Sequence, residues 1–189
     1  MKKIAIFASG NGSNFEKIME NIQVGFLDQI EVTSLITDKR EAFAIERARR
    51  FRLPVHIIEP NQFESKASYE AQILKTLQRE EVEWVILAGY MRLIGPTLLN
   101  AYEGKILNIH PSLLPSFPGK NAIGQALEYG CRVSGATVHF VDSGMDTGKI
   151  IDQMSCPIYE TDTIDTLQLR VQNLEYELYP RVIKKLIND

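Results

Sequence analysis

The stretch Ile4-Ala5-Ile6-Phe7-Ala8-Ser9-Gly10-Asn11-Gly12-Ser13-Asn14 decides the fold class of this chain. Its apolar start, Ile4–Ala8, predicts a buried strand. A glycine-rich turn follows, and an amphipathic helix from about Asn14 to Ile22 comes next. A strand that passes through a tight turn into a helix opens a βαβ unit, so the sequence predicts an α/β domain.

The same alternation of apolar runs and amphipathic stretches continues to about residue 100. The predicted strands are Glu31–Thr37, Val55–Ile58 and Val82–Ala88, and the predicted helices are Glu41–Phe51 and Ser68–Glu80. Such alternation predicts right-handed crossovers, and hence a twisted, mostly parallel sheet flanked by helices. Residues 1–100 are therefore expected to be Rossmann-like.

The pattern changes in residues 101–189, where we expect a mixed second half of the same single domain, 1–189. The predicted helices are Pro96–Tyr102, Ala122–Tyr129 and Thr163–Ile187, the last with a pause at Pro180, and the predicted strands are Lys105–His110, Val133–Val141 and Lys149–Ile158. The last two strands are joined by the turn-rich segment Asp142–Gly148, which favours a hairpin over a crossover.

Composition narrows the class of protein. The chain has 189 residues, of which 44% are hydrophobic and 24% charged, as in soluble globular proteins. The net charge of -3 argues weakly against nucleic acid as a partner. Cys131 and Cys156 form no CxxC pair and indicate a reducing compartment, and three histidines without ligand spacing indicate no metal. No stretch approaches the ~20 apolar residues of a membrane span. We expect a cytoplasmic protein with no membrane or nucleic-acid partner.

The turn Ser9–Asn14 suits a phosphate group. Glycines let the backbone approach the anion, and the first N–H groups of the following helix point outward unpaired. Ser13 and Asn14 either add donors or cap the helix. The turn is no Walker loop, and Phe15 stands where a GxGxxG fingerprint has its third glycine. A plain strand-to-helix turn without a ligand is the alternative.

The run Asn108-Ile109-His110-Pro111-Ser112-Leu113-Leu114-Pro115 carries the strongest sign of chemistry. On a strand, Asn108 and His110 project to the same side, so an amide and an imidazole can point at one developing oxyanion. The alternative is a hydrogen-bonded structural histidine beside a strand-end cap. The loop after the next strand offers an acid for His110, and local sequence does not choose between Asp142 and Asp146.

Taken together, these segments resemble the glycinamide ribonucleotide formyltransferase family of purine biosynthesis. The resemblance covers essentially the whole chain and rests on Gly10-Asn11-Gly12-Ser13-Asn14, Gly89-Tyr90-Met91-Arg92, the Asn108–Pro115 run, Val138-His139-Phe140-Val141 with Asp146, and Arg170-Val171-Gln172 with Glu175 and Tyr179-Pro180. It implies the formyltransferase fold and transfer of a formyl group from 10-formyltetrahydrofolate, as co-substrate, to the amine of glycinamide ribonucleotide. No metal is implied, and the protein would be a monomer or a homodimer.

The resemblance also assigns roles to residues. It implies that Asn108, His110 and Asp146 are catalytic. Residues 1–100 would form the half that binds the nucleotide phosphate, through Gly12, Ser13 and Asn14, and residues 101–189 the folate-binding and catalytic half, with Glu175 at the ribose or amine of the substrate. Met91, Arg92, Leu93 and Ile94 would line the pterin pocket with Asp142 and Asn108. A cis bond before Pro115 is implied as well. Asn121 and Gln172 depart from residues that many relatives carry.

Other interpretations remain open. Methionyl-tRNA formyltransferase has an additional C-terminal domain and formyltetrahydrofolate deformylase an additional N-terminal one, and the length of this chain leads us to expect neither activity. A non-catalytic nucleotide- or folate-binding module would not need the trio. His56 and His139 are expected to be structural, and the basic residues Arg47, Arg49, Arg50 and Arg52 to decorate a helix face and its end.

Overall fold

The computed structural model describes residues 1–188, and Asp189, the last residue of the predicted domain, lies outside the described residues. The strands are β1 (Lys2–Phe7), β2 (Ile30–Thr37), β3 (Val55–Ile57), β4 (Trp84–Leu87), β5 (Ile106–His110), β6 (Val133–Phe140) and β7 (Ile150–Pro157). The helices are α1 (Ser13–Gln23), α2 (Ala44–Arg50), α3 (Lys66–Arg79), α4 (Pro96–Ala101), α5 (Ala122–Tyr129) and α6 (Ile164–Ile183), with a 3-10 turn at Pro60–Gln62 and a π-helical turn at Lys184–Asn188.

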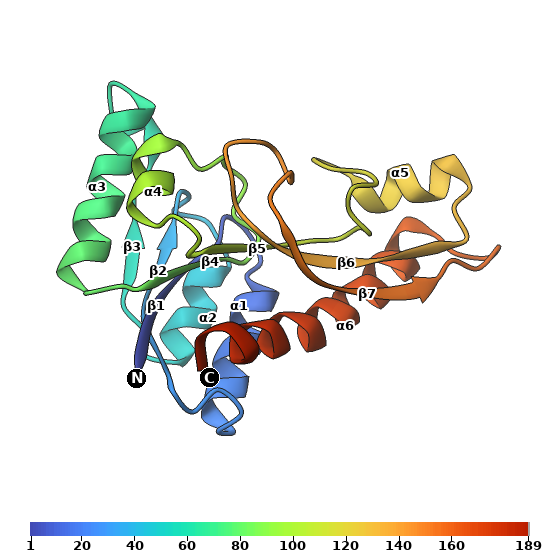
Figure 1. Cartoon of the computed structure of the whole chain (residues 1–189), viewed down its shortest axis with the longest axis horizontal. Coiled ribbons are helices and arrows are strands. Elements are labelled where there is room, and N and C mark those ends of the chain that lie inside the picture. Colours follow the sequence, from blue (N-terminus) through green and yellow to red (C-terminus); the bar gives the residue numbers. More distant parts are fainter. Residues whose placement is uncertain (189) are drawn as a thin grey trace.

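All strands join one twisted sheet in the order β3-β2-β1-β4-β5-β6-β7 (Figure 1). The pairs among β1 to β5 are parallel, whereas β5–β6 and β6–β7 are antiparallel. The predicted parallel first half and the hairpin-like second half are confirmed. After β1 the chain builds β2 and β3 on one side and later β4 and β5 on the other, so the strand order reverses between β1 and β4. Open α/β sheets bind ligands at such a reversal, beyond the carboxyl ends of the strands.

Helices cover both faces of the sheet, and this explains why residues 4–7 of β1 are all apolar. Ile4 and Ile6 point into one core, under α1, α2 and α6, while Ala5 and Phe7 point into the other, under α3 and α4. Successive strand residues face opposite sides, so the part of a strand that is covered on both faces is apolar, whereas Lys2 and Lys3 lie at its uncovered start. This burial fixes the end of β1, and therefore the glycine turn that follows it.

The expected pause at Pro180 was wrong, because α6 runs through this residue to Ile183. Proline removes one backbone donor from the helix. The preceding Tyr179 is fully buried, and its hydroxyl donates to the carbonyls of Leu87 (2.9 Å) and Leu107 (3.0 Å) in β4 and β5. Tyr179 thereby ties this turn of α6 to β4 and β5.

Candidate active site

A cavity of about 570 Å³ opens at the carboxyl ends of β1, β4 and β5. This volume is typical of sites for small molecules. Every residue predicted for the site lines it: Gly12, Ser13, Asn14, Met91, Arg92, Leu93, Ile94, Asn108, His110, Asp142, Asp146 and Glu175. The glycine turn and the Asn-x-His run, which are far apart in sequence, therefore face one space.

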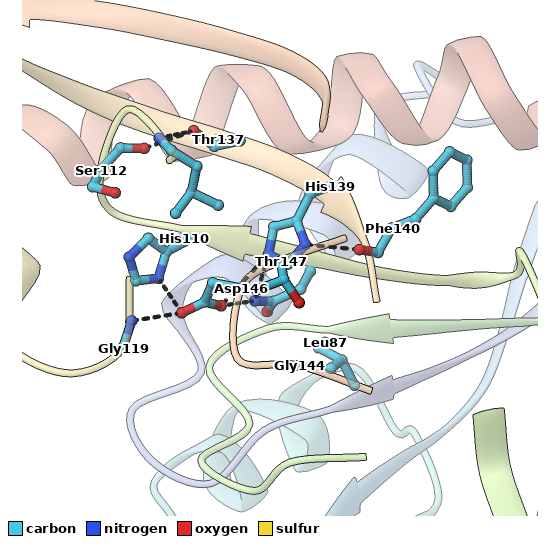
Figure 2. Close-up of polar contacts among 12 residues, drawn as sticks. Leu87, His110, Ser112, Gly119, Thr137, His139, Phe140, Gly144, Asp146 and Thr147 are labelled. Atoms are coloured by element: carbon cyan, nitrogen blue, oxygen red, sulfur yellow. Dashed lines mark hydrogen bonds and ion pairs between the residues drawn. The ribbon is translucent and has the colours of Figure 1, made fainter. Parts of the chain in front are cut away.

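The structure brings Asn108, His110 and Asp146 together inside this cavity. Asn108 and His110 lie on β5, and Asp146 comes from the loop between β6 and β7. The Asp146 carboxylate lies 3.3 Å from Nδ1 of His110 and 3.4 Å from the amide nitrogen of Asn108, and it accepts the Gly119 N–H at 2.8 Å (Figure 2). Nε2 of His110 faces the carbonyl of Phe117 at 2.8 Å. Both ring nitrogens of His110 thus have polar partners.

Asp146 is set apart from Asp142 by its contacts. Asp142 accepts hydrogen bonds from the Gly144 N–H and the Thr147 hydroxyl, both in its own loop. Burial disfavours the carboxylate form of Asp146, but its contact with His139, the Gly119 N–H and the nearby imidazole of His110 outweigh burial and hold the pKa of Asp146 below its usual value. Asp146 is therefore the carboxylate that the structure places beside the imidazole.

His139 belongs to the same cluster, although the sequence analysis predicted only a structural role for it. It lies on β6, paired with Asn108 of β5, and is 2% exposed. Its Nδ1 is 2.8 Å from the Phe140 carbonyl, which can only accept, so Nδ1 carries a hydrogen. In the neutral ring Nε2 then accepts an N–H of Asn108 at 3.2 Å, and the same nitrogen lies 3.6 Å from the Asp146 carboxylate. His139 could have been predicted to lie beside Asn108 only if the antiparallel register of β5 and β6 had been known.

The glycine turn ends at Gly12, which is the N-cap residue of α1 in the left-handed conformation (φ 74°). No side chain caps this helix, so capping, one of the two alternatives for Ser13 and Asn14, is excluded. Asn14 instead donates its amide N–H to Glu175 of α6 at 2.8 Å. Gly12, Ser13 and Asn14 line the cavity, so the free N–H groups at the start of α1 lie at its edge.

Glu175 is an unusual carboxyl group. It is buried beside the cavity, and burial raises its pKa to about 7, although the Asn14 hydrogen bond acts in the opposite direction. The side-chain oxygen of Asn14 is buried as well and has no hydrogen-bond partner in the structure. The Asn14–Glu175 pair therefore places one unsatisfied acceptor, the Asn14 side-chain oxygen, at the edge of the cavity.

Residues 90–94 form another part of the cavity wall, and contacts that the sequence did not predict hold them and the adjacent Gly95 in place. The Met91 N–H donates to the Ser9 hydroxyl at 2.9 Å, and Arg92 donates to buried Asp38 at 2.7 Å. The Gly95 N–H donates to buried Glu70 of α3 at 2.5 Å. Met91 and Leu93 nevertheless remain exposed apolar side chains in the cavity wall. Large apolar side chains open to a cavity suit a flat organic ligand.

Further findings concern other residues and properties considered in the sequence analysis. Asn121 and Gln172, the two departures from the family pattern, both line the cavity, and so does the cation Lys39. The peptide bond before Pro115 is cis, as the resemblance implied. Within residues 1–188, no group of three or more histidine, cysteine, aspartate or glutamate side chains is arranged to hold a metal ion. No helix in that range is long and apolar enough to span a membrane.

Comparison with known proteins agrees with this geometry. The chain matches the formyl transferase family over residues 2–183. It is 53% identical to the phosphoribosylglycinamide formyltransferase of Bacillus subtilis (strain 168), over 99% of this chain and 95% of that protein. Its structure is similar to glycinamide ribonucleotide transformylase 1 from Geobacillus kaustophilus, with a TM-score of 0.96 and 50% identity over 99% of each chain. The phosphoribosylglycinamide formyltransferase from Streptococcus pneumoniae TIGR4 gives a TM-score of 0.91 and 47% identity, over 98% of this chain and 99% of that one. The chain therefore belongs to the formyl transferase family.

Proposed function

We propose that this chain transfers the formyl group of 10-formyltetrahydrofolate to the amine of glycinamide ribonucleotide, giving formylglycinamide ribonucleotide and tetrahydrofolate in purine biosynthesis. The family and the relatives named for this activity support the proposal. The observation that carries it is the contact of Asp146 with His110 and Asn108 in the cavity that also contains the glycine turn. Location in the cytoplasm and a monomeric or dimeric state stay predictions.

The proposed chemistry is direct attack of a neutral amine on the formyl carbon. The tetrahedral intermediate carries an oxyanion, to which Asn108 and protonated His110 donate hydrogen bonds. The Nδ1–H of His110 stays with Asp146. The Nε2–H leaves the Phe117 carbonyl and donates to the oxyanion. Asp146 stabilises the imidazolium and helps move a proton from the attacking amine to the leaving folate nitrogen. No covalent enzyme intermediate is needed.

Different parts of the cavity are assigned to different parts of the substrate. We assign the substrate phosphate to the backbone N–H groups and side chains of Gly12, Ser13 and Asn14, at the start of α1. Glu175, beside Asn14, would contact the ribose or the amine end. The half formed by residues 1–100 would thus hold the nucleotide phosphate, and the half formed by residues 101–189 would provide the catalytic groups.

The pterin ring of the folate is assigned to the wall formed by Met91, Arg92, Leu93 and Ile94, with Asp142 and Asn108 nearby. The apolar side chains of this wall would pack on the ring, and polar groups at its edge would orient it. The exposed apolar surface and the cavity volume of about 570 Å³ support this assignment.

The test uses purified protein with glycinamide ribonucleotide and 10-formyl-5,8-dideazafolate, with absorbance reporting release of the deformylated folate analogue. We expect a signal that requires both substrates. Reactions without the nucleotide measure transfer to water, and reactions with an aminoacylated initiator tRNA measure transfer to RNA. Formyl transfer to water or to tRNA, with none to glycinamide ribonucleotide, would overturn the proposed acceptor.

A further inference from the structure

The basic side chains on α2 do not simply decorate a helix face, because Arg47 turns back onto the glycine turn. Its Nε donates to the main-chain carbonyl of Asn11 at 2.9 Å, and its Nη2 donates to the side-chain oxygen of the same residue at 2.7 Å. The planar guanidinium group thus holds one residue of the turn by two parallel bonds. The Arg47 side chain is 15% exposed, compared with 67% for Arg49.

The close packing of α2 on the turn fixes this contact in space. The Ala44 N–H donates to the Gly10 carbonyl at 3.0 Å. A Cβ atom added to Gly12 would lie 2.6 Å from the Cβ of Ala44, so the turn and the start of α2 lie too close for a side chain at position 12. Gly12 is therefore required both for its positive φ and for this approach.

Arg47 also pairs with a carboxylate that stands near the proposed phosphate site. Glu16 lies in the first turn of α1, and its two oxygens contact Arg47 and Arg50 of α2 (3.5 Å for Arg50). A carboxylate in the first turn suits the helix dipole, but it would repel a phosphate bound at the same helix end. The two arginines place compensating positive charge against it.

We propose that Arg47 is a positioning residue for the phosphate-binding turn, with Arg50 as its electrostatic partner. Arg47 fixes the Asn11 peptide, and with Arg50 it balances the negative charge of Glu16, so that the start of α1 accepts a phosphate dianion. This inference rests on the proposed function, in which the turn binds the phosphate of the substrate. The inference adds that α2, which does not itself contribute to the phosphate contacts, determines how well the turn binds.

The experiment compares four variants with the wild type: Arg47→Met, Arg47→Lys, Arg49→Met as the matched control on the same helix, and Arg47→Met combined with Glu16→Gln. The kinetic readouts are kcat, KM for glycinamide ribonucleotide and KM for the formyl folate. Inorganic phosphate is the probe of the turn, through its inhibition constant against glycinamide ribonucleotide. The melting temperature of each variant reports on folding.

Arg47→Met is expected to raise KM for glycinamide ribonucleotide and the inhibition constant of phosphate about tenfold, the effect of losing a charge-assisted hydrogen bond. kcat and KM for the folate should stay within about twofold, since uniform substrate binding is what is lost. Arg47→Lys keeps the charge but not the two-pronged contact with Asn11, so we expect an intermediate effect. Adding Glu16→Gln to Arg47→Met should recover part of the loss, and Arg49→Met should behave as the wild type.

The inference is overturned if Arg47→Met and Arg49→Met have the same KM for the nucleotide and the same phosphate inhibition. It is also overturned if Arg47→Met changes kcat and both KM values together with a lower melting temperature, because a general structural role predicts that pattern. Failure of the premise looks different. In that case inorganic phosphate does not compete with glycinamide ribonucleotide even in the wild type, and the proposed phosphate site falls together with the role of Arg47.

Discussion

Replacing Asp146 by asparagine removes one negative charge from the cluster while disturbing its shape very little. Asp146 has a positive φ of 56°, a conformation that asparagine tolerates better than most residues. The amide oxygen of asparagine can still accept the Gly119 N–H, which Asp146 holds at 2.8 Å. The substitution therefore tests the charge of the side chain more directly than alanine would.

The size of the effect follows from the distance to the imidazole. At 3.3 Å, a carboxylate and an imidazolium attract each other by about 5 kcal/mol if the effective dielectric constant is about 20. Desolvation of the two groups offsets part of this attraction, which leaves about 3–4 kcal/mol. Asp146→Asn should then lower kcat by about two to three orders of magnitude, within the range of general acid–base catalysis.

The assay combines turnover of glycinamide ribonucleotide and 10-formyl-5,8-dideazafolate with calorimetric titration of the nucleotide. We expect the dissociation constant of the nucleotide to stay close to that of the wild type, because Asp146 is assigned no contact with the phosphate. Asp142→Asn is the comparison, and its kcat should fall much less, since Asp142 bonds within its own loop. A kcat for Asp146→Asn within about tenfold of the wild type would refute the proposed role.

Three other substitutions test the neighbouring parts of the cavity. Gly12→Ala should lower the free energy of unfolding by about 1–3 kcal/mol and raise KM for the nucleotide, because its Cβ would lie 2.6 Å from that of Ala44 at a positive φ; thermal melting and kinetics measure both effects. The pKa of Glu175 rises on folding from 4.5 to about 7, so its contribution to stability is complete below pH 4.5 and is lost as the pH rises toward 7. Glu175→Gln should therefore be more stable than the wild type at pH 8, by at most about 3 kcal/mol, and equal to it near pH 4.5, and urea unfolding at the two pH values checks this. His139→Phe removes the acceptor of an Asn108 N–H and should lower kcat about tenfold at unchanged KM for the nucleotide, so equal kcat values in steady-state assays would contradict the assigned contact.

Much of the fold could be predicted from the sequence, because the signals are local. The apolar run of β1 and the alternation up to β4 indicate a parallel sheet covered on both faces, and the turn-rich segment 142–148 indicates the hairpin. Element ends were less accurate. The helix expected from Glu41 begins at Ala44, because the Ala44 N–H is bound to the Gly10 carbonyl. That contact lies between two segments far apart in sequence, so local propensity cannot show it.

In the candidate site, too, some residues could be predicted from local sequence and others only from contacts between distant segments. Asn108 and His110 could be paired from strand geometry alone, since side chains two apart share a face. The choice of Asp146 over Asp142 required either a family resemblance or the structure, because the contact with Gly119 joins two loops. Arg47 was misread for a related reason. A run of arginines on a helix indicates an exposed face, and only the packing of α2 against the turn shows which of them is buried.

The two partners of His110 also bear on how the cluster would lower the reaction barrier. Its Nε2 lies 2.8 Å from the Phe117 carbonyl, so a formyl oxygen must compete with that carbonyl for the same N–H. Before attack the formyl oxygen is itself a neutral carbonyl, and the exchange brings little gain. Once the oxyanion forms, the imidazolium N–H donates to an anion instead of a neutral carbonyl, so this hydrogen bond strengthens as the charge develops. The hydrogen bond from His110 is then gained mainly in the transition state, which is the condition for an interaction to raise kcat rather than only tighten substrate binding.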